Sequence, residues 1–257
     1  MHKHSLISLS LSLGQYADFV DEIVNITKTE ACSDYICVAN VHMLVEAHND
    51  AAFATAVNDA AITTPDGVPL TWALKWLHGI RQERVAGMDL LPDLLMQASL
   101  QKLPVFFYGT TPQILEETEQ YVKTHYKGIP SIATYSPPFR DLTKDEDDEI
   151  VNKINHSGAK LIFVSLGCPK QEKWMASMKG RINGIMIGIG GALPVLLKKQ
   201  KRAPRWMQNA GLEWTYRFLQ EPKRLWKRYF TTNAKFVFLI LKEKRKGKKI
   251  IRKVEQF

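Results

Sequence analysis

The sequence contains few cysteines, and their spacing suggests neither a metal site nor a disulfide scaffold. Cys32, Cys37 and Cys168 are the three cysteines of the 257-residue chain. An odd, small number of cysteines is typical of proteins from a reducing compartment. The sequence also lacks a P-loop, a zinc motif and a nucleophile elbow. We therefore expect no metal and no cofactor.

Long hydrophobic runs are also absent. The longest uninterrupted one, Phe236–Leu241, has six residues, whereas a helix that crosses a bilayer needs about 20. Near the N-terminus, Leu6–Leu13 alternates between apolar and polar residues and is followed by no small-residue cleavage site. Alternation favours a half-buried strand over a signal peptide. These features predict a cytoplasmic protein that is soluble or peripheral at a membrane.

Acidic residues are scarce in the last quarter of the chain. Residues 198–257 contain 19 Lys and Arg but only 4 Asp and Glu, a net charge of +15. Residues 1–197 contain 16 basic and 22 acidic residues, a net charge of −6. The overall charge of +9 therefore comes from the C-terminal segment. Such a basic segment suits an anionic partner, namely a lipid headgroup surface, a nucleic acid or a pyrophosphate.

Short apolar runs alternate with helical patterns along the first three quarters of the chain. Strands are predicted at residues 35–39, 104–108, 161–164 and 184–189. Thr111 followed by Pro112 is a good helix start, and Thr143 precedes a helix with an acidic first turn. This alternation predicts an α/β fold, with a Rossmann-like parallel sheet and helices on both faces.

The character of the sequence changes near residue 198. We predict an α/β domain at residues 1–197 and a basic, aromatic, helical appendage at residues 198–257. From Gly211 to Leu241 the pattern fits two amphipathic helices that are separated at Pro222. The appendage carries the positive charge, so we expect it to contact the anionic partner.

Asp66 is the carboxylate that we favour as a catalytic base. It lies between Pro65 and Gly67 in a segment, residues 63–67, that is predicted to be a turn. In open α/β sheets, ligands bind beyond the carboxyl ends of the strands. A loop aspartate at such an end can take a proton from a bound hydroxyl. The alternative is that Asp66 only forms the turn, as Asp before Gly often does.

Further polar groups follow other predicted strands. Asn40 and His42 come just after a buried strand and could hydrogen-bond a sugar or a base, although an isolated histidine is more often a packed or surface residue. Gly109 and Thr110 precede a helix start, where backbone N–H groups favour anions. The alternative for Gly109–Thr111 is an ordinary helix cap.

Two glycine-containing loops lie later in the chain. Gly167 opens a loop that leads to Gln171 and Glu172, which could hydrogen-bond a ribose or a uracil, or could simply begin a helix. Residues 188–191 suggest a dinucleotide-binding loop, but Leu193 occupies the position of its last glycine. A nicotinamide oxidoreductase is therefore disfavoured.

Together these segments resemble one family, the WecG/TagA/CpsF glycosyltransferases (glycosyltransferase family 26). The resemblance covers about residues 5–230, and its order and spacing are highly specific. The segments that carry it are Ala39–His42, Thr64–Gly67, Arg84–Leu90, Phe107–Thr110, Ser165–Glu172, Gly188–Gly191, Lys201–Met207 and Gly211–Arg224.

The resemblance implies an inverting transferase that acts at the cytoplasmic face of the membrane without a metal. It would move a sugar, such as N-acetylmannosamine, a uronic acid or glucose, from a UDP-sugar to a sugar on a polyprenyl diphosphate, in cell-surface polysaccharide or teichoic acid-type synthesis. Asp66 would be the base, with Asn40 beside it in the catalytic site. Substrate binding would fall to Thr64, Arg84, Gly109, Thr110, Gly167, Gln171, Glu172 and Gly190. The lipid diphosphate would be bound by Arg217, Arg224, Lys227 and Arg228.

Some features depart from the family or leave alternatives open. Leu193 and Pro194 stand where many relatives have Phe-Asp, so the donor sugar stays open. Basic residues interleaved with aromatics also suit single-stranded nucleic acid. The net charge of −6 on residues 1–197 argues against a large nucleic-acid footprint, so we expect no nucleic-acid partner. Association into homo-oligomers stays open.

Overall fold

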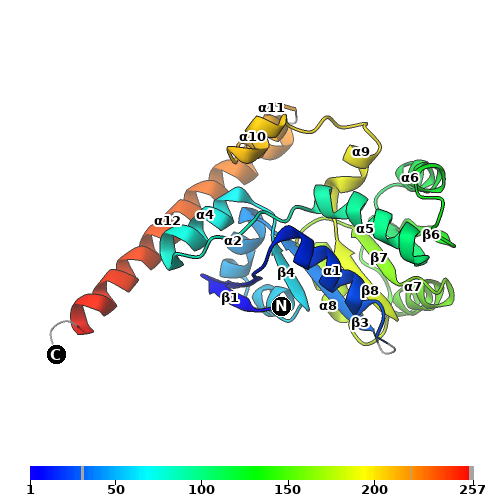
Figure 1. Ribbon diagram of the computed structural model, residues 1–257, viewed down its shortest axis with the longest axis horizontal. Helices are drawn as coiled ribbons and strands as arrows, with labels where there is room; N and C mark the ends of the chain where they lie inside the picture. Colours follow the sequence, from blue (N-terminus) through cyan, green and yellow to red (C-terminus); the bar gives the residue numbers. More distant parts are fainter. Residues whose placement is uncertain (30–31, 221, 255–257) are drawn as a thin grey trace.

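The predicted strands form one six-stranded parallel sheet in the computed structural model, which describes residues 1–29, 32–220 and 222–254 (Figure 1). The strand order is β4-β3-β8-β7-β5-β6. The sheet strands are β3 (Ser33–Ala39), β4 (Ile62–Pro65), β5 (Val105–Gly109), β6 (Ile132–Tyr135), β7 (Leu161–Ser165) and β8 (Gly184–Gly188). The prediction of a parallel α/β sheet is confirmed.

Alternating side chains bury both faces of this sheet. In β3, Tyr35 and Cys37 pack into one core, whereas Ile36 and Val38 pack into the other. The first core is covered by α2 (Val41–Asn49), α3 (Ala51–Asn58), α4 (Val68–His78), α7 (Lys144–His156) and α8 (Lys170–Met178). The second is covered by α1 (Tyr16–Ile26), α5 (Gly87–Gln101), α6 (Pro112–His125) and α9 (Leu193–Leu196). Helices therefore lie on both faces, as predicted.

The N-terminal segment differs from its prediction as a single strand. It forms a hairpin of β1 (Lys3–Leu6) and β2 (Leu9–Ser12), with Leu6 paired to Leu9. The chain reverses at Ile7, whose φ of 60° is left-handed. Alternation continues on both sides of this tight turn, so the apolar pattern alone does not reveal the reversal.

Two of the helices begin at the threonine caps that the sequence predicts. Thr111 accepts a hydrogen bond from the N–H of Ile114 at the start of α6. Thr143 and Glu146 form a capping box at the start of α7. Both predicted starts are confirmed. The edge strand β6 was not predicted, because its four residues are only partly buried and show no apolar run.

The segment predicted as a turn at residues 63–67 is only partly a turn. Ile62–Pro65 forms the edge strand β4, which pairs in parallel with β3. The turn therefore starts at Asp66, and α4 begins two residues later. A threonine pair before proline lacks the apolar run of a typical buried strand, which explains the difference.

After β8, the C-terminal segment packs first against the second core, through α9, and then against the first core, through α12 (Pro222–Val254). This segment comprises η1 (Gly190–Ala192), α9, α10 (Arg205–Asn209), α11 (Glu213–Gln220) and α12. Two helices are found on either side of the predicted boundary at Pro222, with α11 ending at Gln220 and α12 beginning at Pro222, and Glu221 lies outside the described residues. In Figure 1, α12 runs alongside α2 and α4 and extends past the body of the molecule. Its Phe236, Leu239 and Ile240 join the first core. No helix in the described ranges is both long and apolar enough to cross a membrane.

Gly109, at the end of β5, lies where the chain turns close to β7. Its φ is +108°, and a Cβ built on it would lie 2.5 Å from the carbonyl oxygen of Ser165. Backbone at that distance cannot yield as a flexible side chain can, so only glycine fits here. Gly158 also has a positive φ, of +67°, but a Cβ there would meet nothing within 4 Å.

Alanine variants of Gly109 and Gly158 test whether the close contact at the end of β5 constrains the fold. We expect Gly158→Ala to cost about 1–2 kcal/mol of unfolding free energy, because only the left-handed backbone penalises it. Gly109→Ala adds a steric clash and should cost more. Urea unfolding of the two variants measures both. Equal losses would show that the contact with Ser165 does not constrain the fold.

Candidate active site

Asp66 lies at the carboxyl end of the sheet, where the tip of β4 is fixed by backbone hydrogen bonds. The N–H of Asp66 donates to the carbonyl of Ala39, 2.8 Å away, at the end of β3. The N–H of Val85 donates to the carbonyl of Pro65 at 3.0 Å, so the segment that carries Arg84 is fastened to the same tip. Two segments distant in sequence thus present a carboxylate and a guanidinium at one place.

A cavity of about 550 Å³ opens at this place between the sheet end, α4 and the C-terminal segment. Its volume is in the range of small-molecule sites. Four of the predicted site residues line it: Asn40, Asp66, Arg84 and Arg217. His42 and Glu213 also contribute to its polar part. The sequence-based choice of Asp66 therefore coincides with a real cavity, and 31% of its side chain remains exposed.

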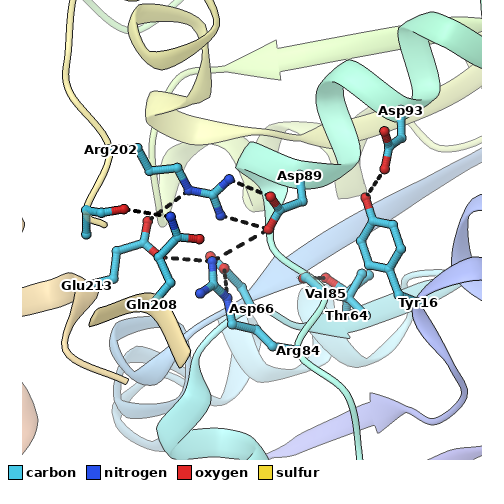
Figure 2. Close-up of polar contacts among 11 residues, drawn as sticks. Tyr16, Thr64, Asp66, Arg84, Val85, Asp89, Asp93, Arg202, Gln208 and Glu213 are labelled. Atoms are coloured by element: carbon cyan, nitrogen blue, oxygen red, sulfur yellow. Dashed lines mark hydrogen bonds and ion pairs between the residues drawn. The ribbon is translucent and has the colours of Figure 1, made fainter. Parts of the chain in front are cut away.

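An ion network joins the strand tip to the C-terminal segment (Figure 2). Arg84 Nη2 lies 2.9 Å from Glu213 Oε2, and Arg84 Nε lies 3.9 Å from Asp66 Oδ1. Arg202 makes a two-pronged contact with Asp89, with Nη2 to Oδ2 at 2.8 Å. Arg202 Nε is also 3.6 Å from Glu213 Oε1. Glu213 therefore links the two arginines and holds α11 over the cavity.

The surroundings of Asp66 favour a base that functions near neutral pH. Burial raises the pKa of its carboxyl to about 6. The guanidinium groups of Arg84 and Arg217 lower this pKa, while the carboxylates of Glu213 and Asp89 raise it. A carboxyl with this pKa is ionised at pH 7 and more basic than an ordinary aspartate. Asp66 can therefore accept a proton from a bound hydroxyl.

Asn40 has a structural task as well as a place in the cavity. Its Oδ1 accepts a hydrogen bond of 3.1 Å from the N–H of Met43 and so caps α2. The cap uses the carbonyl oxygen of the side chain. The amide NH₂ group is the donor that Asn40 can offer to a ligand beside Asp66.

Thr64 is fully buried and does not line the cavity. Its hydroxyl donates to the carbonyl of Val85 at 3.0 Å, beside Arg84 (Figure 2). Thr64 thus supports the segment that positions Arg84. Its predicted contact with substrate stays a prediction.

Gln171 and Glu172 are buried at the start of α8, below the two glycine loops. Gln171 Oε1 accepts hydrogen bonds from the N–H groups of Gly167 and Gly190, both at 3.2 Å. Gln171 Nε2 donates to Glu172 Oε1 at 2.7 Å. Burial raises the pKa of Glu172, whereas this hydrogen bond lowers it. The pair holds the two loops together, and direct contact with substrate stays a prediction.

Gly109 and Thr110 lie apart from Asp66 along the sheet edge. Strands β3, β8 and β7 stand between β4 and β5 in the sheet. The N–H of Thr110 already donates to the carbonyl of Ser165 at 3.0 Å. The structure therefore does not bring this pair into the Asp66 cavity, and their predicted role in binding stays untested.

Arg217, on α11, connects the Asp66 cavity to a second one. This second cavity, of about 510 Å³, is also lined by Gly191, Lys199 and Lys201. Arg217 Nη2 would lie 3.5 Å from a Cβ built on Gly191, so it reaches the loop that follows β8. One guanidinium can thus serve an anion in either cavity. The other predicted diphosphate ligands, the side chains of Arg224, Lys227 and Arg228, lie outside the described residues.

Sequence reasoning missed Arg202, Asp89 as its partner, and Glu213. Arg202 and Glu213 do lie within the two segments that resemble the family most strongly. Asp89 lies in the first turn of α5, where no side-chain cap hydrogen bond occurs. Its carboxylate pairs with Arg202, 113 positions away, and no local pattern encodes such a contact.

Comparison with known proteins agrees with this geometry. The model of the glycosyl transferase WecG/TagA/CpsF family matches residues 4–250. A relative from Bacillus spizizenii is named N-acetylglucosaminyldiphosphoundecaprenol N-acetyl-beta-D-mannosaminyltransferase. It is 33% identical over 216 residues, which cover 84% of this chain and 81% of the relative. The chain therefore belongs to the WecG/TagA/CpsF family and is a glycosyltransferase.

Proposed function

We propose that this glycosyltransferase moves a sugar, with inversion, from a UDP-sugar to a sugar on a polyprenyl diphosphate, and that Asp66 is its general base. The observation that carries the proposal is the half-buried Asp66 carboxylate in a cavity that also contains Arg84 and Arg217. N-acetylmannosamine is the donor sugar that we favour, and N-acetylglucosaminyl diphospholipid the acceptor, because the Bacillus spizizenii relative is named for that reaction.

The proposed chemistry needs one base and several cations. Asp66 takes the proton of the acceptor hydroxyl while that oxygen forms a bond to the anomeric carbon of the donor. The bond from that carbon to the UDP oxygen breaks, and UDP leaves with the electron pair. Arg84 and Arg217 line the cavity, and their guanidinium groups can balance the negative charge on the leaving UDP and on the lipid diphosphate. Their paired N–H donors suit phosphate oxygens.

We also propose that α12 docks on the inner face of the membrane. Trp226, Phe230 and Leu241 expose 59%, 76% and 46% of their surface. Spacings of four and eleven residues place them on one side of the helix. Lys242, Arg245 and Lys246 are charged residues of the same helix. An amphipathic helix with aromatic and basic residues is suited to an anionic bilayer surface.

The proposed transfer is tested by incubating the full chain with UDP-sugars and an N-acetylglucosaminyl diphospholipid, followed by mass detection of the product. We expect Asp66→Asn to lower kcat by about 10²–10⁴-fold, as loss of a general base does. The folded-state pKa of Asp66 is above its ordinary value, so its ionisation opposes folding as pH rises from about 4 to 6. At pH 7.5 the variant should therefore melt no lower than the wild type.

Asp141→Asn is the control, because Asp141 is an exposed residue outside the cavity. It should leave both kcat and Tm unchanged. Near-normal transfer by Asp66→Asn would contradict the assignment of the base. Absence of transfer by the wild type from every UDP-sugar would contradict the proposed reaction.

The pH dependence gives a second test. Asp66 must be ionised to accept a proton, so kcat/KM for the acceptor should fall as pH drops through about 6. The carboxylate of Glu213 raises the pKa of Asp66. Glu213→Gln should therefore move the acidic limb of the profile to lower pH, whatever it does to the absolute rate. Glu243→Gln, on α12, is the control and should not move it. An unchanged midpoint in Glu213→Gln would contradict the coupling.

Membrane docking is tested by flotation with phosphatidylglycerol-containing vesicles. Replacing Trp226, Phe230 and Leu241 by serine removes the exposed apolar side chains of α12 and should weaken vesicle binding at least tenfold. The matched control makes the same change at Met96, Leu100 and Phe139, which expose 49%, 69% and 85% of their surface and do not belong to α12. That control should bind like the wild type. Equal binding by both triple variants would exclude this face of α12 as the docking surface.

A further inference from the structure

The Asp66 cavity has two chemically different halves. Charged and amide side chains gather at one end, around Asp66, Arg84 and Arg217. Away from that end, the lining residues are mostly apolar and come mainly from two helices, α4 and α12. A site for a nucleotide sugar alone would need polar groups along its length, because sugar hydroxyls and phosphates are hydrogen-bonded throughout. The apolar half therefore calls for a different ligand group.

One wall of the apolar half is a single face of α4. Its lining residues are Val68, Pro69, Trp72, Ala73 and Trp76. Spacings of four residues put them on one side of the helix. Trp72 and Trp76 remain 58% and 49% exposed, although both line the cavity. The helix begins directly after Asp66 and Gly67, so this wall starts at the carboxylate and extends about 12 Å at 1.5 Å per residue.

The opposite wall is a matching face of α12. Thr232, Asn233, Phe236, Val237 and Ile240 line the cavity with the same spacing. The wall changes from polar to apolar along the helix. Phe236 and Ile240 are anchored in the core, whereas Val237 is 55% exposed and faces the open groove. The two walls thus form an apolar groove that continues from the charged end.

At the far end of the groove, the side chain of Lys244 joins the two helices. Lys244 Nζ donates to the carbonyl of Trp76 at 2.7 Å and lies 5.1 Å from the centre of its ring. This contact joins α12 to α4 beyond Ile240. At the near end, a Cβ built on Gly211 would lie 3.0 Å from Val68, so the C-terminal segment crosses closely over α4 there. The far end of the groove is therefore defined by a contact between α4 and α12, and the near end by the close approach of Gly211, which precedes α11, to α4.

We propose that this α4–α12 groove binds the first isoprene units of the lipid chain of the acceptor. The proposal rests on the proposed function. A ligand that joins an anionic diphosphate to a long apolar chain matches the cavity at both ends, because Arg84 and Arg217 meet the phosphates and the tryptophan face meets the chain. Binding the chain would also fix the distance between the diphosphate and Asp66, and so orient the sugar hydroxyl.

The test compares two ligands. Farnesyl diphosphate carries a short prenyl chain, and inorganic pyrophosphate is its counterpart without a chain. Binding to the full chain is measured by titration calorimetry below the concentration at which farnesyl diphosphate forms micelles. We expect the prenyl compound to bind at least tenfold more tightly than pyrophosphate, because burial of apolar surface adds to the charge contacts. Equal affinities would overturn the proposal.

Two neighbouring residues of α12 supply matched variants. Val237→Lys places a charge in the groove, whereas Phe238→Lys places the same charge on the next residue, which is 62% exposed and does not line the cavity. Both changes add one positive charge to α12. We expect Val237→Lys to reduce farnesyl diphosphate affinity to that of pyrophosphate, and Phe238→Lys to change it less than twofold. Equal losses in both variants would overturn the groove assignment.

Light scattering and sugar transfer separate the remaining outcomes. If a second copy of the chain occupies the groove, the molar mass from light scattering will rise with protein concentration, and Val237→Lys will abolish that rise. Farnesyl diphosphate will then fail to bind, which overturns the proposal. If farnesyl diphosphate binds as expected but no sugar is transferred to any acceptor, the groove stands and the proposed reaction fails. Transfer that is insensitive to Val237→Lys with both long-chain and short-chain acceptors would overturn the groove while leaving the reaction intact.

Discussion

The ion network around Arg84 is the interaction on which the rest of the site depends. Arg84 lies between Asp66 on the sheet edge and Glu213 on α11, and Arg202 extends the network to Asp89. Charges that are partly withdrawn from water are costly unless they are paired. Removing the C-terminal segment would leave Arg84 without its contact to Glu213 at 2.9 Å. The ion pair between Arg84 and Glu213 thus helps to hold the C-terminal segment over the cavity.

The same network adjusts the chemistry that we propose. Burial and the carboxylate of Glu213 make Asp66 a stronger base, while Arg84 keeps it ionised at neutral pH. Because Glu213 belongs to the covering segment, the basicity of Asp66 is coupled to the position of that segment. Beyond the charged groups, the cavity becomes apolar between α4 and α12. This change from charged to apolar lining is the basis of our proposal that one cavity binds a sugar, a diphosphate and the beginning of a lipid chain.

Much of the fold could be predicted from the sequence, because its signals are local. The starts of α6 and α7 depend on Thr111 and Thr143, which cap the helix that follows each of them. The hairpin at Lys3–Ser12 was missed because the alternation continues on both sides of its turn. The four-residue edge strands β4 and β6 were missed because neither contains a long apolar run. For the site, Asp66, Asn40, Arg84 and Arg217 were predicted and share one cavity. Arg202 and Glu213 were not, since their contacts join positions far apart in the chain.

The central claim is that Asp66 faces the acceptor hydroxyl while arginines balance the phosphates. The most direct measurement is a crystal structure of the full chain with UDP and an N-acetylglucosaminyl diphospholipid analogue. The account predicts an acceptor hydroxyl within about 2.6–3.2 Å of an Asp66 carboxylate oxygen, with the lipid diphosphate at Arg217. An acceptor hydroxyl directed at Glu213 or at solvent, with Asp66 out of reach, would contradict it.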